Sequence, residues 1–205
     1  MRFEEAELRE CSELYNMPEE PANKTILANH LMAPYRFVMI MGLSSTGKST
    51  FLDAYTGRKG WGLTKWNRDN VMDMVFQDGT RVDKFYGYLA EFEGRLFDKL
   101  FVRERHQVVV EGWNTLPRLR RRYLNYMPET IGRSAIFVFD GPVEEIIKRN
   151  VASNKINLSR QELPLFLKNR YNSIVWPTFS EGWNDIYYIN TFGARGTTYL
   201  KDKLE

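Results

Sequence analysis

One short segment of the chain carries a complete chemical motif. Residues 42–49 read Gly-Leu-Ser-Ser-Thr-Gly-Lys-Ser, the G-x-x-x-x-G-K-[ST] pattern of a phosphate loop. Its two glycines let the backbone curl so that consecutive N–H groups point toward phosphate oxygens, while Lys48 reaches the β- and γ-phosphates. The Ser49 hydroxyl is a ligand for Mg²⁺. We therefore expect ATP and Mg²⁺ here, with the nucleotide bound by Gly42, Ser44, Ser45, Thr46, Gly47, Lys48, Ser49 and Thr50.

The segments that flank the loop fit the same interpretation. The apolar run Phe37-Val38-Met39-Ile40-Met41 predicts a buried parallel strand, and residues 48–56 predict a helix that ends before Gly57. A strand, a loop and a helix N-terminus in this order form an anion site, because the free N–H groups and the helix dipole both favour negative charge.

Further residues of chemical interest follow other predicted strands. Ligands of open α/β sheets bind at the carboxyl ends of the strands. Asn67-Arg68-Asp69 ends one such strand, and Glu111-Gly112-Trp113-Asn114 ends another. Asp69 is the candidate general base that accepts the proton of an attacking hydroxyl. The alternative is that Asp69 only caps a helix.

The neighbours of Asp69 are candidate substrate contacts. Arg68, Glu111 and Asn114 are expected beside the acceptor, although Glu111 could instead hold Mg²⁺ or water. Trp113 could stack a base, whereas the other tryptophans are expected mostly in the core. Asp140-Gly141-Pro142 favours a turn between a strand and a helix.

A polar segment at 153–160 predicts a basic lid over the nucleotide. A lid arginine stabilises the charge of a transferring phosphoryl group, and Arg149 is the candidate, with Lys155 and Arg160 behind it. The alternative is that these are solvated charges at helix ends.

Strands and helices alternate along most of the chain. The predicted strands are 35–41, 61–66, 106–112, 134–140 and 185–189, and the predicted helices are 48–56, 69–77, 82–104, one from Pro117, 142–152 and 161–173. This alternation predicts an α/β protein with the P-loop NTPase fold, a parallel β-sheet flanked by helices. Residues 3–33 are expected to form one or two helices, broken near Pro18 and Pro21. We divide the chain into a helical N-terminal extension (1–33) and a P-loop domain (34–205).

Length and composition limit the class of protein. A chain of 205 residues with net charge +3 fits one globular domain. The single cysteine, Cys11, fits a reducing compartment, and no apolar run approaches the roughly 20 residues that span a bilayer. We expect a cytoplasmic protein without a membrane partner. Basic clusters at 118–122 and 148–170 are compatible with a polyanionic substrate.

The chain resembles the phage-type polynucleotide kinases, a group of small P-loop kinases, over roughly residues 35–190. The motifs that carry the resemblance are the loop at 42–49, Asn67-Arg68-Asp69-Asn70, Val109-Val110-Glu111-Gly112-Trp113-Asn114 with Pro117, and Val138-Phe139-Asp140 through Ile147-Lys148-Arg149-Asn150. The resemblance implies that Lys48 and Ser49 bind ATP and metal, that Asp69 activates a 5′-hydroxyl, and that lid arginines touch the phosphates.

The chain departs from the family pattern at two positions. The family has an arginine three residues after the base, which contacts the phosphate of the acceptor, and this position is Met72 here. It has another arginine four residues after the one that matches Arg149, and this position is Ser153.

These features together predict an ATP- and Mg²⁺-dependent kinase with Lys48, Asp69 and Arg149 as catalytic residues. The expected acceptor is a hydroxyl of nucleic acid, with DNA favoured over RNA. The resemblance also suggests a phage-encoded enzyme that acts in the host cytoplasm. Alternative acceptors are a hydroxymethylated base in DNA, such as 5-hydroxymethyluracil, and a small metabolite or nucleoside. The alternative from another class is a nucleotide-binding module or NTPase that transfers no phosphate.

Overall fold

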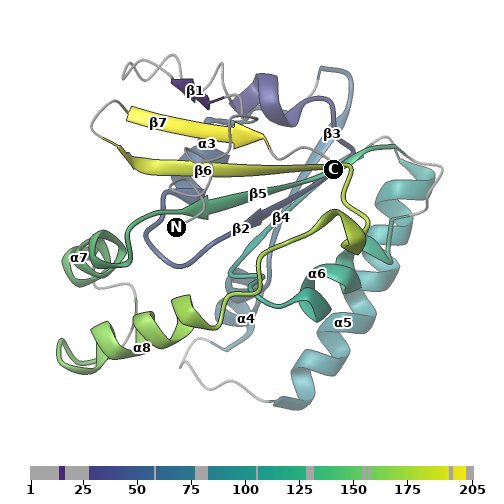
Figure 1. The fold of residues 1–205 in the computed structure, drawn as a ribbon. Coiled ribbons are helices and arrows are strands. Elements are labelled where there is room, and N and C mark those ends of the chain that lie inside the picture. Colours follow the sequence, from purple (N-terminus) through teal and green to yellow (C-terminus); the bar gives the residue numbers. More distant parts are fainter. Residues whose placement is uncertain are drawn as a thin grey trace.

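Within the part of the chain that the structure describes, seven strands form a central sheet in the order β1-β7-β6-β5-β2-β4-β3 (Figure 1). The computed structural model describes residues 14–16, 28–57, 59–76, 83–104, 106–127, 132–153, 156, 158–193 and 196–201. Among these residues, no helix has the length and apolar character needed to cross a bilayer.

Five neighbouring strands of the sheet run parallel. They are β2 (Phe37–Met41), β3 (Gly62–Asn67), β4 (His106–Gly112), β5 (Ser134–Asp140) and β6 (Asp185–Gly193). This confirms the predicted parallel sheet. After β2 the chain builds β3 and β4 on one side and then β5 and β6 on the other. The carboxyl end of β2 therefore lies where the strand order reverses, which is the usual place for a ligand in such sheets.

Helices cover both faces of this sheet (Figure 1). Their bounds are α3 (Lys48–Ala54), α4 (Arg68–Val75), α5 (Asp83–Asp98) with a π-helical continuation (Lys99–Arg103), α6 (Pro117–Leu124), α7 (Val143–Ser153), α8 (Glu162–Asn172) and a 3₁₀ turn (Phe179–Glu181). The predicted helices are present, with ends that differ by a few residues.

Alternation along β2 divides the core into two layers, because successive side chains of a strand point to opposite faces. Phe37, Met39 and Met41 pack with residues of α4, α5 and α6, among them Met72, Phe97 and Tyr123. Val38 and Ile40 pack on the other face with Phe51 and Leu52 of α3. Because every residue of β2 is buried, the phosphate loop that follows it starts from a fixed point.

Two antiparallel strands extend the sheet beyond β6. β7 (Gly196–Lys201) pairs with β6, and β1 (Leu14–Asn16) pairs with β7. The prediction of helix over residues 3–33 is therefore wrong at 14–16, and the last predicted strand, 185–189, is too short. A three-residue segment has no periodicity to read, since its extended form comes from pairing with a strand at the far end of the chain.

The segment before β2 also contributes to the core. Residues 28–32 are helical, and Ala28, Leu31 and Met32 are buried in the same layer as α3. The amide of Gln107, on β4, donates hydrogen bonds of 2.8 Å to the carbonyls of Met32 and Tyr35. The division at residue 33 stays a prediction, but this packing joins residues 28–32 to the sheet. Other residues of the predicted extension, including Pro18 and Pro21, lie outside the described part of the chain.

Truncation of Met32 tests this packing. Met32 is fully buried, so Met32→Ala removes apolar contacts and leaves a cavity. We expect the free energy of unfolding in urea to fall by about 2–5 kcal/mol. The matched control is His30→Ala on the same helix, where the side chain is exposed and the change should stay within about 0.5 kcal/mol. Equal effects of the two substitutions would contradict a structural role for this helix.

Candidate functional site

The phosphate loop has the compact geometry that its glycines allow. Gly47 has φ +94°, and a Cβ there would lie 2.9 Å from Cγ2 of Thr191. At Gly42 a Cβ would lie 2.6 Å from the carbonyl oxygen of Phe139. Both positions therefore require glycine, and the loop packs directly against the ends of β5 and β6. Its backbone enters α3 at Lys48, so the free N–H groups of the helix face the loop.

The side chains of the loop are ordered by its own carbonyl groups. The Lys48 ammonium donates to the carbonyl of Leu43 at 2.6 Å, and the Thr46 hydroxyl donates to the same oxygen at 2.9 Å. A cavity of about 270 Å³ opens beside them, lined by Ser45, Gly47, Lys48, Ser49, Thr50, Arg149 and Ser153. Most of the predicted nucleotide contacts thus line one cavity, and Arg149 lines it with them.

Arg149 is held at this cavity by the end of β6. Its guanidinium donates to the hydroxyl and the carbonyl of Thr191 at 3.1 and 3.0 Å, and lies 3.7 Å from the ring centre of Phe192. The Thr191 hydroxyl in turn donates to the carbonyl of Thr46 at 2.9 Å. Sequence reasoning missed Thr191, because it lies beyond the predicted end of that strand; the correct strand end would have indicated it.

Two further contacts join α7 to the phosphate loop. The buried Asn150 amide donates to the carbonyl of Ser44 at 2.9 Å, and the hydroxyls of Ser153 and Ser45 lie 3.2 Å apart. Ser153 therefore lines the cavity at the position where the resembling family has arginine. Part of the predicted lid, including Lys155, lies outside the described residues.

A hydroxyl and a carboxylate meet where the loop approaches β4. Ser49 Oγ donates to Glu111 Oε1 at 2.8 Å, and the amide of Asn67 donates to Glu111 Oε2 at 3.4 Å. Hydroxyl and carboxylate oxygens are ligands that Mg²⁺ accepts beside the phosphates of a nucleotide. The donor set of Ser49 and Glu111 therefore fits the metal that a phosphate loop implies.

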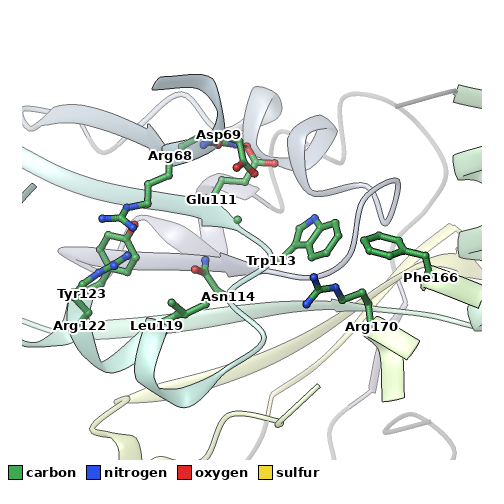
Figure 2. Close-up of a pocket in the computed structure, with 12 residues that line it drawn as sticks. Arg68, Asp69, Glu111, Trp113, Asn114, Leu119, Arg122, Tyr123, Phe166 and Arg170 are labelled. Carbon is green, nitrogen blue, oxygen red and sulfur yellow. Dashed lines mark hydrogen bonds between the residues drawn. The ribbon is translucent and has the colours of Figure 1, made fainter. Parts of the chain in front are cut away.

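Glu111 lines a second cavity, of about 420 Å³ (Figure 2). Its lining comes from the carboxyl ends of β3 and β4, from the residues that follow β4, and from α4, α6 and α8. It comprises Asn67, Arg68, Asp69, Glu111, Gly112, Trp113, Asn114, Leu119, Arg122, Tyr123, Phe166 and Arg170. We call it the acceptor pocket. It brings Asp69, Glu111 and Asn114, three of the predicted site residues, around one space.

Asn67 caps α4. Its side-chain oxygen accepts hydrogen bonds from the backbone N–H groups of Asp69 and Asn70 at 2.9 and 3.3 Å. The alternative that Asp69 serves only as the helix cap is therefore wrong. The Asp69 carboxylate lies in the first turn of α4, where the helix dipole favours negative charge, and it lines the acceptor pocket.

Arg68 lines the same pocket, but its guanidinium is bound to Glu93 of α5. Two hydrogen bonds of 2.6 Å join the groups, and Glu93 is fully buried. Burial disfavours the charged form of Arg68, but the hydrogen bond and the attraction of Glu93 outweigh it and raise the pKa of Arg68 above its usual value. Arg68 was predicted to contact substrate, but its guanidinium instead forms an ion pair with Glu93 in the wall of the pocket.

Glu93 organises this wall and was missed by sequence reasoning. It also accepts hydrogen bonds from the indole of Trp66 at 2.7 Å and from the hydroxyl of Tyr123 at 2.9 Å. A signal was present, since Glu93 lies on the stripe of Leu89, Leu96 and Leu100, where a lone carboxylate indicates a buried partner.

The remaining predicted residues divide into pocket and scaffold. Asn114 lines the pocket but is buried, and its amide donates to the carbonyl of Ile40 at 3.3 Å. Arg120, one of the predicted basic cluster, is fully buried and pairs with Glu181, with an Nε–Oε2 distance of 2.7 Å, so it is a structural residue and not a polyanion contact. Met72 is the buried residue of α4 and packs in the core.

Of the five tryptophans, Trp66 and Trp183 are buried in the core and Trp176 packs against it, as expected for most of them. Trp113 lines the acceptor pocket. The Asp140 carboxylate accepts from the N–H of Gly141 at 2.7 Å, which confirms the predicted turn.

Comparison with known proteins gives similarity of fold. No family model matches the sequence, and no curated protein sequence is significantly similar to it. A chain of the Pnkp1/Rnl/Hen1 RNA repair complex superposes with a TM-score of 0.52 at 18% identity, over 78% of this chain and 46% of that one. Another structure of the Pnkp1/Rnl/Hen1 complex gives 0.46 at 22% identity, over 66% and 40%. A gluconokinase from Sinorhizobium meliloti 1021 gives 0.47 at 15% identity, over 80% and 86%.

The first similarity, with the sheet order and the loop geometry, shows that the chain has the α/β fold of P-loop proteins. This chain matches less than half of the length of the two Pnkp1/Rnl/Hen1 chains.

The ion pair in the pocket wall gives a stability prediction. Glu93→Gln removes the charge that compensates Arg68, and we expect the free energy of unfolding in urea to fall by about 3 kcal/mol. The matched control is Glu91→Gln on the same helix, whose ion pair with Arg95 is exposed and should contribute less than about 0.5 kcal/mol. A loss at Glu93 no larger than at Glu91 would contradict the structural role of this pair.

Proposed function

We propose that this protein is an ATP-dependent kinase that transfers the γ-phosphate to a hydroxyl group bound in the acceptor pocket. The observation that supports it most directly is the hydrogen bond between Ser49 and Glu111, 2.8 Å long. Ser49 lines the nucleotide cavity and Glu111 lines the acceptor pocket, so the two spaces adjoin at this contact. A nucleotide held by the loop would direct its terminal phosphate toward the space that Asp69 lines.

Binding of ATP is the task of the phosphate loop. Its backbone N–H groups and the Lys48 ammonium hold the β- and γ-phosphates. Ser49 and Glu111 would hold Mg²⁺, which when bound neutralises charge on these phosphates. Arg149 lies in the same cavity, fixed by Thr191, and places a guanidinium near the triphosphate. Its charge stabilises the transferring group.

Asp69 acts as the general base. Its carboxylate accepts the proton of the acceptor hydroxyl as the hydroxyl oxygen bonds to the γ-phosphorus. The bond from that phosphorus to the bridging oxygen breaks, and ADP leaves with the electron pair. Asn67 fixes the backbone of Asp69, and the pair of Arg68 with Glu93 braces the wall beside it. These contacts let the base keep one position during transfer.

The acceptor that we propose is a hydroxyl of nucleic acid, with the 5′-hydroxyl of a strand as the leading candidate. Support comes from the lining of the pocket, where the aromatic side chains of Trp113, Tyr123 and Phe166 stand beside Arg122 and Arg170. Aromatic faces and guanidinium groups are the side chains that bind bases and phosphates. The similarity in fold to a chain of an RNA repair complex agrees with this proposal.

Replacement of the base tests the proposed reaction. The assay uses γ-labelled ATP with a panel of 5′-hydroxyl oligonucleotides, oligonucleotides with hydroxymethylated bases, nucleosides and gluconate. We expect label in the 5′-hydroxyl oligonucleotides. Asp69→Asn should lower kcat about a hundredfold or more, because proton transfer is lost, with little change in the KM for ATP. Asp73→Asn, an exposed carboxylate one turn further along α4, is the control and should keep kcat.

The same assay separates the kinase from an NTPase. ATP consumption that survives unchanged in Asp69→Asn, with no labelled acceptor in the wild type, would refute phosphotransfer and favour a nucleotide-binding module. Label found only in gluconate or nucleosides would support a kinase but contradict the proposal that its acceptor is nucleic acid.

A further inference from the structure

One wall of the acceptor pocket combines two aromatic rings with an arginine. Trp113 follows β4, and Phe166 and Arg170 stand four residues apart on α8, so they share one helix face. The rings of Trp113 and Phe166 lie 6.0 Å apart at 53°. The Arg170 guanidinium lies 5.7 Å from the Trp113 centroid and 5.3 Å from that of Phe166. We call these three side chains the aromatic wall (Figure 2).

The arginines around the pocket differ in how they are bound. The guanidinium groups of Arg68 and Arg120 are engaged by Glu93 and Glu181. The Arg170 guanidinium contacts the rings of Trp113 and Phe166 and makes no hydrogen bond or ion pair to another described residue. Arg122 lies 3.9 Å from Glu93, and its buried Nε has no hydrogen-bond partner within the described part of the chain. Arg170 is therefore the cation of the pocket whose guanidinium keeps its donors for a ligand, among the described residues.

The charged side chains of the pocket lie on different sides of it. Asp69 and Glu111 lie along one edge in Figure 2, next to Arg68, whose charge is balanced by Glu93. Arg122 and Arg170 lie apart from each other, toward the two ends of the opposite edge. A ligand that presents a hydroxyl to the carboxylates and an anion to Arg170 matches this arrangement. The volume of about 420 Å³ suits one small ligand or one residue of a polymer.

We propose that the acceptor pocket binds the terminal nucleotide of a single strand, with its base on the aromatic wall and the phosphate on its 3′ side at Arg170. The inference rests on the proposed function for the position of the reacting hydroxyl, which is the 5′-hydroxyl beside Asp69. The terminal base must be unpaired, because a base within a duplex cannot stack on a side chain. A polyol acid could bind an arginine of the pocket through its carboxylate, but it has no ring to stack on Trp113 and Phe166.

Binding of a short single-stranded oligonucleotide with a free 5′-hydroxyl and a fluorophore at its 3′ end tests the phosphate contact. Fluorescence anisotropy is measured with a non-hydrolysable ATP analogue present. Arg170→Gln should weaken binding about tenfold or more, since a charge-assisted hydrogen bond is lost. It should also flatten the slope of log K against log salt by about 0.7, the value for one phosphate contact on a single strand.

The matched control is Lys168→Gln, which removes the same charge from an exposed residue of α8 outside the pocket. It should leave the affinity within about twofold of wild type. Equal behaviour of the Arg170→Gln and Lys168→Gln variants, or no binding of the oligonucleotide by the wild type, would overturn the inference.

The base contact has a separate test. An oligonucleotide whose 5′-terminal residue is abasic should bind the wild type about fivefold or more weakly, because the stacked base is absent. In the Phe166→Ala variant, the ratio of the affinities for the intact and the abasic oligonucleotide should be smaller than in the wild type. An unchanged ratio would contradict stacking of the base on the aromatic wall. Trp113 is left intact, because its indole donates to the Ser44 hydroxyl at 3.2 Å and its replacement would remove this contact with the phosphate loop.

These outcomes separate the inference from the proposed function. An oligonucleotide that binds through Arg170 and its terminal base but receives no phosphate refutes the kinase and keeps the binding site. A protein that phosphorylates a small hydroxyl compound, and whose binding of the oligonucleotide does not depend on Arg170, keeps the kinase and refutes the binding site.

Discussion

Hydrogen bonding between β2, β4 and β3 aligns Met41 with Gly112 and Asn67 with Glu111. Parallel strands in this register end at one edge of the sheet, so the phosphate loop, the cap of α4 and Glu111 meet there without any long-range adjustment. A shift of one residue in β4 would turn Glu111 to the other face and separate it from Ser49. The fully buried residues of β2, fixed between two packed layers, prevent such a shift.

The charged groups near the site divide into two kinds. Glu93 with Arg68, and Glu181 with Arg120, are buried pairs that hold α4, α5 and α6 in place, and their net contribution depends on complete hydrogen bonding. Arg149, Arg122 and Arg170 stand at the cavities instead. Phosphate binding is proposed only for arginines of the second kind. Arg120 and Arg122 show that neighbouring arginines of one helix can differ in this way, since Arg120 is fully buried and Arg122 lines a cavity.

Much of the fold could be predicted because its signals are local. Continuous apolar runs indicated β2, β4 and β5, and the phosphate loop indicated the nucleotide cavity. The roles of Arg68 and Arg120 could not be predicted, since an arginine near a strand end has the same local pattern whether it faces a ligand or a buried glutamate. β1 was not predicted, because its extended conformation comes from pairing with β7 and not from a local sequence pattern. Thr191 was missed through the misjudged end of β6, and Phe166 because the helix that carries it had an uninformative pattern.

The pairing of β1 with β7 joins the two ends of the chain, Leu14 with Leu200. Closing a loop of nearly the whole chain for a ladder of three residues costs much entropy and returns few contacts, so this ladder should form late in folding and open early. β7 pairs in turn with β6, whose Thr191 carries both the phosphate loop and Arg149. Opening of the β1–β7 ladder should therefore leave the nucleotide cavity formed, because the described contacts of Thr191 run to Thr46 and Arg149 and not to β1.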